Sequence, residues 1–300
     1  MQFELIALET PAGNHPSALY TAVANNMRFC TPSKAIVRYD RSLDAPYLRA
    51  QIEEISVTLR KDRCLAILES LLSQTKQRLD GSANTWDGTI NLVTANTKAE
   101  EPYIELSDIR MLCDHLDLNV DDIQLYQVLD TDSLSPNSLY VFVDSCVGYD
   151  DASKPNWVGK LQVVGGPEGV VLSEGGCVLL GTNASKDGCQ IKAYQGDLGE
   201  LLKELHAEIN EPYISTRLLS EQWQREWLNA SRALYQEHDA LIELNNTANT
   251  IGYIGAGHNA MGLAIASSYL HNPLNRHIDR VWLITEQEKP QLISVTRSVL

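Results

Sequence analysis

Two cysteines and one histidine are the residues of this chain whose types could support nucleophilic chemistry. Cys146 comes directly after a predicted strand, and Cys30 is the second candidate thiol. A thiol becomes an effective nucleophile when a neighbouring base removes its proton. His258, at the start of a predicted helix, is the candidate base, but no histidine is close to either cysteine in the sequence. Two interpretations stay open: a catalytic thiol, and cysteines that only fill space.

Two further patterns suggest ligand sites, and in both cases a structural role is expected instead. A glycine-rich turn at 252–257 comes before a predicted helix and could hold a phosphate group. Its spacing is G-x-x-G-x-G, which does not fit the dinucleotide-binding pattern, so close packing of the helix is expected. Acidic residues at 100–101, 121–122, 130 and 132 are spread over predicted turns, which favours solvated loops over a metal site. We therefore expect no cofactor and no metal.

Composition limits the class of protein. The chain has 300 residues, 44% of them hydrophobic, and a formal net charge of −15. An acidic surface repels nucleic acid and anionic lipid, so charged partners are expected to be basic. The six cysteines show no zinc-binding spacing, which favours reduced thiols in a cytoplasmic protein. The beginning, MQFELIALETPAG, has no basic region followed by an apolar run, so no secretory leader is expected, and no apolar stretch is long enough to span a membrane.

The elements that would position these residues begin with two short apolar runs, 139–143 and 177–180. Each is bounded by Asp, Gly or Ser, which is typical of strands buried on both faces. About thirty residues rich in Gly, Pro, Asp and Ser separate them, with Trp157 in the middle. A long connection of this kind is uncommon inside a compact domain and is often functional.

Helical periodicity is clearest at 62–79, 197–209 and 215–236. Trp223 and Trp227 stand one helical turn apart in the last of these, and form either a partner-binding stripe or part of the core. Further strands are predicted at 89–94 and 123–129, and a terminal hairpin at 280–285 and 291–297. The alternation of helices and strands predicts an α/β fold with a mostly parallel sheet.

Four segments, in order, resemble the thiolase-like superfamily, and within it the β-ketoacyl synthases. They are LETPAGNHPSALYTAVANNMRFC, RCLAILESLLSQ, the pair YVFVDS and EGGCVLLGT, and GYIGAGHNAMGLAIASSYL. The resemblance implies two similar α/β halves stacked as a five-layer sandwich. Here the halves would be residues 1–183, including the long connection, and 184–300. They would form one compact unit that is shorter than a full ketosynthase.

The same resemblance implies that the catalytic residues have been lost. In the family, a nucleophilic cysteine begins a helix between the strands that match 123–129 and 139–143. The segment 130–137 contains no cysteine and is too short for such a helix. The first family histidine would fall near 244–250, where there is none. The second falls on Tyr253 in a gap-free match, and on His258 only if the match is shifted.

A thiolase-like protein without this chemistry is expected to act through its surface. Degenerate ketosynthase-like proteins that resemble this chain occur in type VI secretion gene clusters, which implies an adaptor or chaperone for a secreted effector. The alternatives are an active acyltransferase that uses a non-standard cysteine, and a chain-length-factor-like subunit that supports an active ketosynthase. Family members dimerise through an edge strand, here assigned to 139–143. The segment before it is short, which argues against dimerisation by that route, so two alternatives stay open: a homodimer, and a partner that adds a strand to this edge if the edge is free. The candidate partner-binding residues are Val141, Phe142, Trp157, Trp223 and Trp227.

Overall fold

The computed structural model describes residues 2–32, 39–40, 45–81, 86–95, 104–126, 134–148, 157, 160–166, 169–183, 185, 187–208, 210–218, 220–235, 242, 244–285 and 291–298. The helices are α1 (Pro16–Ala24), α2 (Arg60–Asp80), α3 (Leu106–His115), α5 (Leu198–Glu204), α6 (Glu221–Tyr235), α7 (Thr247–Ile251) and α8 (His258–His271), with a short 3-10 helix at Pro273–Asn275.

The strands of the first half are β1 (Gln2–Glu9), β2 (Thr31–Pro32), β3 (Tyr39–Asp40), β4 (Ala45–Pro46), β5 (Leu48–Ala50), β6 (Thr89–Val93), β7 (Asp122–Tyr126), β8 (Leu139–Ser145) and β9 (Leu172–Thr182). Those of the second half are β10 (Cys189–Gln195), β11 (Tyr213–Ser215), β12 (Leu244–Asn246), β13 (Arg280–Thr285) and β14 (Gln291–Arg297).

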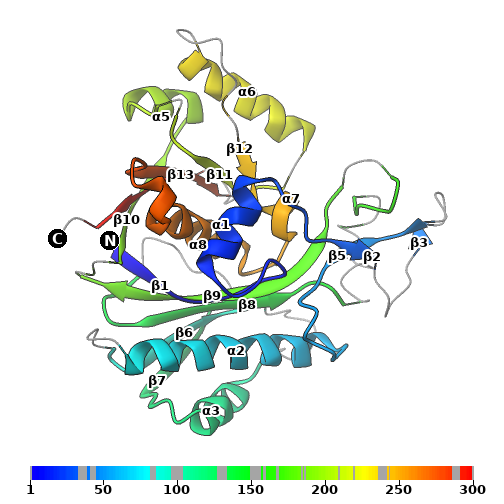
Figure 1. Ribbon diagram of the computed structural model, residues 1–300, viewed down its shortest axis with the longest axis vertical. Helices are drawn as coiled ribbons and strands as arrows, with labels where there is room; N and C mark the ends of the chain where they lie inside the picture. Colours follow the sequence, from blue (N-terminus) through cyan, green and yellow to red (C-terminus); the bar gives the residue numbers. More distant parts are fainter. Residues whose placement is uncertain are drawn as a thin grey trace.

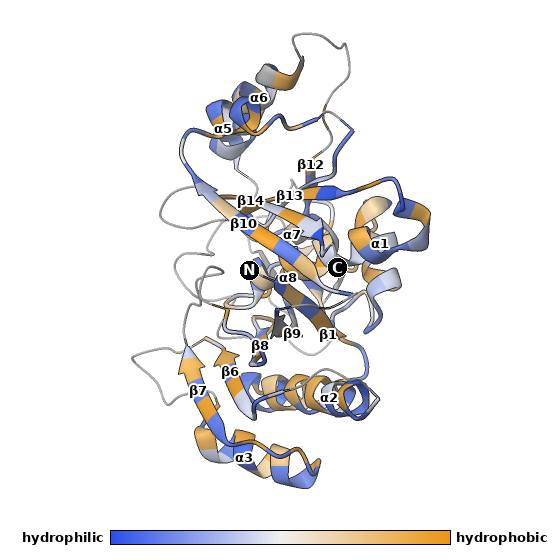
Figure 2. Cartoon of the chain, turned by 90° about the vertical axis from the view of Figure 1, so that its left-hand side faces the viewer, coloured by the Kyte–Doolittle hydropathy of each residue, from blue (hydrophilic) through white to orange (hydrophobic). Residues whose placement is uncertain are grey.

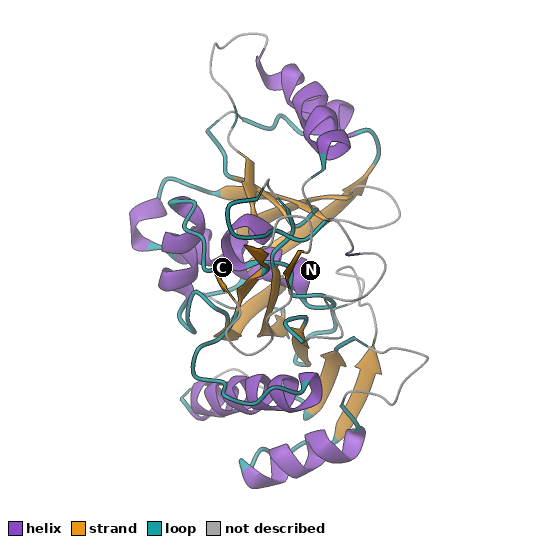
Figure 3. Cartoon of the chain, turned by 90° about the vertical axis from the view of Figure 1, so that its right-hand side faces the viewer, coloured by secondary structure: helices purple, strands orange, loops and turns teal. Residues whose placement is uncertain are grey.

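The chain folds into alternating layers of helices and strands (Figure 1). Helices α2 and α3 cover the outer face of the strands β1, β9, β8, β6 and β7. Helices α1 and α8 lie between these strands and those of the second half. Helices α5 and α6 cover the outer face of β10, β11 and β13. This is the five-layer α/β sandwich that the resemblance implies, and Figure 3 shows the same order of layers from the side.

One sheet connects the two halves. Its order is β12-β11-β13-β14-β10-β1-β9-β8-β6-β7 among the described residues. Strands β6, β7 and β8 are parallel to one another, and β8 pairs antiparallel with β9. The halves join where β1 meets β10, through only the register pairs Gln2↔Gln190 and Phe3↔Cys189. The division at 183 and 184 stays a prediction, since the sheet is continuous across it.

Helix α2 forms as its sequence predicts. Its buried side chains recur at helical spacing and face the sheet, namely Cys64, Ile67, Leu68, Leu71 and Leu72. Hydrophilic side chains occupy its other face, so both colours alternate along α2 in Figure 2. A helix with one apolar stripe is stable when that stripe is buried against a sheet.

Helix α8 is buried along almost its whole length, because it runs between two layers of strands. Small residues (Ala, Gly and Ser) recur along it, and at Gly262 the helix lies close to strand β13. A Cβ at Gly262 would lie 2.4 Å from a methyl carbon of Leu283 in β13. The expected close packing of this helix against the sheet is thus confirmed at Gly262.

The expectation of a free strand edge at 139–143 is wrong. Strand β8 is central and pairs with β6 on one side and β9 on the other. Val141 and Phe142 are 0% and 6% exposed, so they belong to the core. The strand at the end of the sheet is β7, which precedes the connector rather than following it. A run of apolar residues shows that a strand is buried on its faces, but says nothing about its edges.

The predicted partner-binding stripe on α6 is also part of the core. Trp223 and Trp227 are 2% and 6% exposed and pack with Tyr213. The helix begins at Glu221 rather than at the predicted residue 215, since Ser215 ends strand β11 and the described residues 216–218 and 220 are not helical. The terminal hairpin is confirmed as β13 and β14. In the described residues no helix is both long enough and apolar enough to cross a membrane.

Candidate functional site

The carboxyl end of β8 carries the residues from which sequence reasoning expected chemistry. Asp144 is 1% exposed and lies at the centre of this region. Its Oδ1 accepts a hydrogen bond from Nη2 of Arg60 at 2.6 Å, and its Oδ2 accepts one from the backbone N–H of Ala256 at 2.9 Å. Asp144 thereby connects the first residue of α2 with the glycine turn before α8. A charged side chain held this way positions backbone rather than a substrate.

Gly255 allows the glycine turn to approach Asp144. Its φ is +87°, a left-handed conformation that residues with a Cβ rarely adopt. A Cβ at Gly255 would lie 2.2 Å from Oδ2 of Asp144 and 2.9 Å from Sγ of Cys146. The turn therefore closes directly over the end of β8 and leaves no room for a side chain at this position.

A second buried ion pair lies beside the first. Nε of Arg63 donates to Oε2 of Glu174 at 2.6 Å, and Nη2 of Arg63 pairs with the other carboxylate oxygen. The same carboxylate accepts from the Ser145 hydroxyl at 2.9 Å and from the Ile52 backbone N–H at 2.8 Å. Glu174 is 0% exposed and Arg63 is 5% exposed. Both oxygens of Glu174 are hydrogen-bonded, as a buried charge requires.

The sequence analysis missed both ion pairs. Arg60 and Asp144 are 84 positions apart, and Arg63 and Glu174 are 111 positions apart. No local pattern connects residues at such separations. The only available indication was the presence of charged residues inside segments that otherwise read as buried, such as Glu174 in the EGGCVLLGT segment.

Cys146 is enclosed rather than open. It is 6% exposed and packs in an apolar cluster with Trp157 and Leu172. Nη2 of Arg60 lies 4.0 Å from its sulfur, although that guanidinium already binds Asp144. Trp157 is 8% exposed, and it is the described residue at the centre of the long connection. Its side chain is therefore part of the apolar cluster that contains the thiol.

His258 is buried and stays neutral. It is 3% exposed, and burial lowers its pKa to about 4. Its Nε2 lies 2.9 Å from the Thr247 hydroxyl oxygen, and its Nδ1 has no hydrogen-bond partner among the described residues. A general base works best when its pKa is near the working pH, so this imidazole is a poor base at neutral pH.

The ring of Tyr253 is close to both Trp157 and His258. Its ring centre lies 5.3 Å from that of Trp157 and 5.1 Å from that of His258. Its backbone bridges to β9, because its N–H donates to the Val171 carbonyl and its carbonyl accepts from the Ser173 N–H. The residue that a gap-free match places at the second family histidine is thus a tyrosine fixed by its backbone.

The other predicted cysteines lie elsewhere. Cys64, Cys113 and Cys177 are buried, and burial raises the pKa of Cys113 to about 11. Cys30 is partly exposed and lines a groove of about 1130 Å³ beside Glu9 and Glu54. Burial and the nearby Glu54 carboxylate raise the pKa of Glu9, although the Ser70 hydroxyl opposes that shift. The segment 130–133 lies outside the described residues, and so do the acidic residues at 100 and 101.

Comparison with known proteins identifies the fold only. No protein-family model and no curated protein sequence matches the chain. Among solved structures, similar ones include a ketosynthase from module 1 of the bacillaene synthase of Bacillus amyloliquefaciens, with a TM-score of 0.58 and 10% identity over 100% of this chain and 76% of that chain.

Two others come from ketosynthase complexes. A chain from the complex of a type II polyketide synthase acyl-carrier protein with its ketosynthase gives a TM-score of 0.57 at 9% identity, over 100% of this chain and 99% of that chain. A chain from the ishigamide ketosynthase/chain length factor gives 0.53 at 11% identity, over 100% of both chains. Identities this low carry no information about activity. The TM-scores over the whole of this chain show the fold, and the chain has the thiolase-like fold of the ketosynthases.

Proposed function

We propose that this chain is a thiolase-like scaffold without acyl-transfer activity, which works by binding another protein. The observation that carries the proposal is the closure of the carboxyl end of β8. Cys146 is buried in one apolar cluster with Trp157, and His258 is buried, neutral and hydrogen-bonded to Thr247. An acyl-thioester intermediate requires an accessible thiolate and a base beside it, and the described residues do not combine the two.

The partner proposed first is a secreted effector, for which the chain serves as adaptor or chaperone in a type VI secretion system. This follows from the resemblance of the sequence. The net charge of −15 fits a partner with a basic surface, because complementary charge speeds association and selects among partners.

A ketosynthase subunit is the second candidate partner. The likeness to a chain from the ishigamide ketosynthase/chain length factor favours it, since that structure combines a ketosynthase with a chain length factor. In this case the chain supports a catalytic subunit and contributes no nucleophile of its own.

Thiol labelling tests the absence of acyl transfer. We expect no stoichiometric acylation by an acyl-CoA, and we expect a chloroacetamide probe to modify Cys30 before Cys146, because Cys30 is the more exposed. Substituting Trp157→Ala should raise the labelling rate of Cys146 by about tenfold or more, since reactivity follows access to the thiol. Peptide mass spectrometry locates the modification, with Cys146→Ser as the control. Rapid acylation of Cys146 in the unmodified protein would contradict the proposal.

Affinity purification of the tagged chain from its native cells separates the two partners. Recovery of a secreted effector in a fixed ratio supports the adaptor role, and recovery of a cysteine-bearing ketosynthase supports the subunit role. A chain that purifies alone, or only as copies of itself, would contradict both.

A further inference from the structure

A groove of about 1130 Å³ lies beside the first half of α2. Side chains from Arg63 to Ser70 line it along the helix, and these two residues are about 10 Å apart at a rise of about 1.5 Å per residue. The rest of its lining comes from the segments 9–14, 28–32 and 51–55. Ligand pockets for drug-sized molecules measure about 300–1,000 Å³, so this groove has room for a piece of polypeptide. We refer to it as the α2 groove.

Carboxylates without a cationic partner line the α2 groove. Glu53 and Glu54 are exposed, and among the described residues no arginine or lysine pairs with either of them or with Glu9. Glu9 accepts hydrogen bonds from two neutral groups, the Ser70 hydroxyl at 2.5 Å and the Gln74 amide at 3.3 Å, and both reach its Oε2. The other carboxylate oxygen of Glu9 therefore remains available to a ligand.

The arginines of the lining do not balance this negative charge. Arg63 already forms the buried ion pair with Glu174, so its charge is used inside the protein. Against the three carboxylates this leaves the exposed Arg28, which gives the lining a net formal charge of −2 (three negative, one positive). Burial and, to a smaller extent, the Glu54 carboxylate raise the pKa of Glu9. A cation that entered the α2 groove would relieve the repulsion between these two carboxylates.

Apolar side chains accompany the carboxylates. Phe29 and Ile55 are partly exposed and line the α2 groove. Two neighbours of the lining in the sequence, Met27 and Val57, are 45% and 40% exposed. The side chains of arginine and lysine pack an aliphatic stem on apolar surface and extend a charged head beyond it. The described residues contain no group of side chains with the composition of a metal site, so the lining fits basic side chains better than a metal ion.

We propose that the α2 groove binds a short, extended, basic segment of the partner protein, whose arginine or lysine side chains pair with Glu9 and Glu54. An extended chain rises about 3.3 Å per residue, so about three residues match the length of the groove along α2. The inference rests on the proposed function, because it names the surface and the chemistry by which a partner is recognised.

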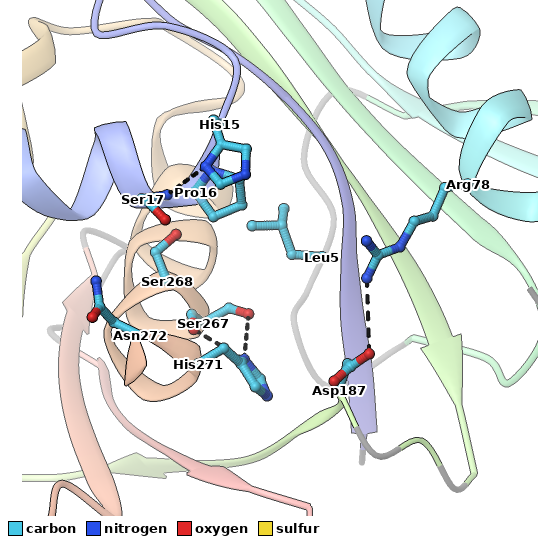
Figure 4. A pocket seen from close by; sticks show the side chains of 10 residues that line it. All are labelled: Leu5, His15, Pro16, Ser17, Arg78, Asp187, Ser267, Ser268, His271 and Asn272. Carbon is cyan, nitrogen blue, oxygen red and sulfur yellow. Dashed lines mark hydrogen bonds and ion pairs between the residues drawn. The ribbon is translucent and has the colours of Figure 1, made fainter. Parts of the chain in front are cut away.

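The cavity between α1 and α8 provides a contrast and a control (Figure 4). Its volume is about 240 Å³, and the carboxylate in its lining, that of Asp187, already lies 3.9 Å from a guanidinium nitrogen of Arg78. A carboxylate that faces a cation of its own protein has less to gain from a cation of another. Removing the Asp187 charge should therefore not affect the binding of a basic segment.

A capped peptide, acetyl-Arg-Gly-Arg-Gly-amide, tests the α2 groove directly. We expect it to shift the backbone amide resonances of Gly13 and Ser70 in a saturable manner. The same peptide with citrulline in place of arginine keeps the shape but not the charge, and should bind at least about tenfold more weakly, which corresponds to about 1.4 kcal/mol.

Charge-neutral variants of the protein locate the interaction. The double variant Glu9→Gln with Glu54→Gln should weaken binding of the arginine peptide at least about tenfold, and Glu54→Gln alone, at an exposed position, about threefold. The matched control is Asp187→Asn with Glu221→Gln, which changes the net charge by the same amount at exposed sites and should weaken binding by less than about twofold. Circular dichroism and thermal unfolding establish that each variant is folded.

The outcomes separate the α2 groove from the proposed function. Binding without shifts at Gly13 and Ser70, equal binding of the citrulline peptide, or an equal loss in the control variant would overturn the groove. Recovery of the same partner by the wild type and by the Glu9 and Glu54 double variant would also overturn it, and would leave the partner-binding role standing. A wild-type chain that purifies alone contradicts the proposed function, whereas the peptide titration still decides whether the α2 groove selects basic segments.

Discussion

The two ends of helix α8 place the same residue type in opposite environments. His258 at the first position is 3% exposed and faces Thr247 and Tyr253, whereas His271 at the last position is exposed and lines an open cavity. The first end lies near the carboxyl end of β8, where the resemblance places catalysis, and packed side chains close it. The second end has no counterpart among the sequence motifs, and it lines a cavity of about 240 Å³. Accessibility, rather than residue type, therefore decides which histidine can act on another molecule.

Breaking the ion pair between Arg63 and Glu174 should have the largest effect on the closed end. Glu174→Gln leaves the Arg63 charge buried without its carboxylate, which costs about 3–5 kcal/mol of unfolding free energy. Urea unfolding followed by circular dichroism measures the change. The control is Asp108→Asn, whose partner Lys61 is partly exposed, and which should cost below about 1 kcal/mol. Equal losses in the two variants would show that the closed end does not depend on its buried charges.

Acid should destabilise the closed end through His258. Its pKa is about 4 in the folded protein, whereas an unperturbed imidazole has a pKa of about 6.5, so between these values the unfolded chain binds a proton that the folded chain does not. Stability is therefore fully present above pH 6.5 and falls as the pH drops towards 4, by about 3 kcal/mol in total.

Replacing the imidazole isolates this contribution. The difference in unfolding free energy between the wild-type protein and His258→Gln, measured from pH 7 to pH 4, should shrink over this window. Thr247→Val keeps the imidazole and should keep the wild-type slope. Parallel pH profiles for the wild type and His258→Gln would mean that the pKa of His258 is the same in the folded and unfolded states.

Two glycine substitutions should give the smallest effect and the most specific one. Gly255→Ala and Gly165→Ala both place a Cβ at positive φ, which costs about 1–2 kcal/mol in each case. Nothing lies within 4 Å of a Cβ at Gly165, whereas a Cβ at Gly255 would meet Asp144 and Cys146. Gly255→Ala should therefore be the more destabilised in a thermal unfolding comparison. Equal melting temperatures would mean that the turn does not press on the end of β8.

The layered fold was predictable because each helix and strand has a pattern that can be recognised in neighbouring residues. The apolar runs that became β8 and β9, and the leucine stripe of α2, are properties of neighbouring residues. The partners of a strand are not, so β8 was taken for an edge strand although β6 and β9 flank it.

The sequence indicated which residues belong to the candidate site, but not whether their side chains are accessible. Sequence reasoning selected Cys146, His258 and Trp157, and two of these lie in or beside one cluster. The burial of Cys146 in one cluster with Trp157, and the pairing of the two α2 arginines with Asp144 and Glu174, depend on contacts between residues far apart in the chain. Of the two interpretations of Trp223 and Trp227, the core position is confirmed, although periodicity gives the face of a helix and not what covers it.

The position of β1 has a consequence for how the protein is made. This strand is synthesised well before its neighbours in the sheet, β9 and β10, which begin at Leu172 and Cys189. At about 5–20 residues per second, β1 waits for about 8–30 s before either neighbour is synthesised. During that interval its apolar residues are without a sheet, and the long-range pairing that follows is slow. The join between the two halves is therefore completed late, although β1 is synthesised long before the two strands that it pairs with.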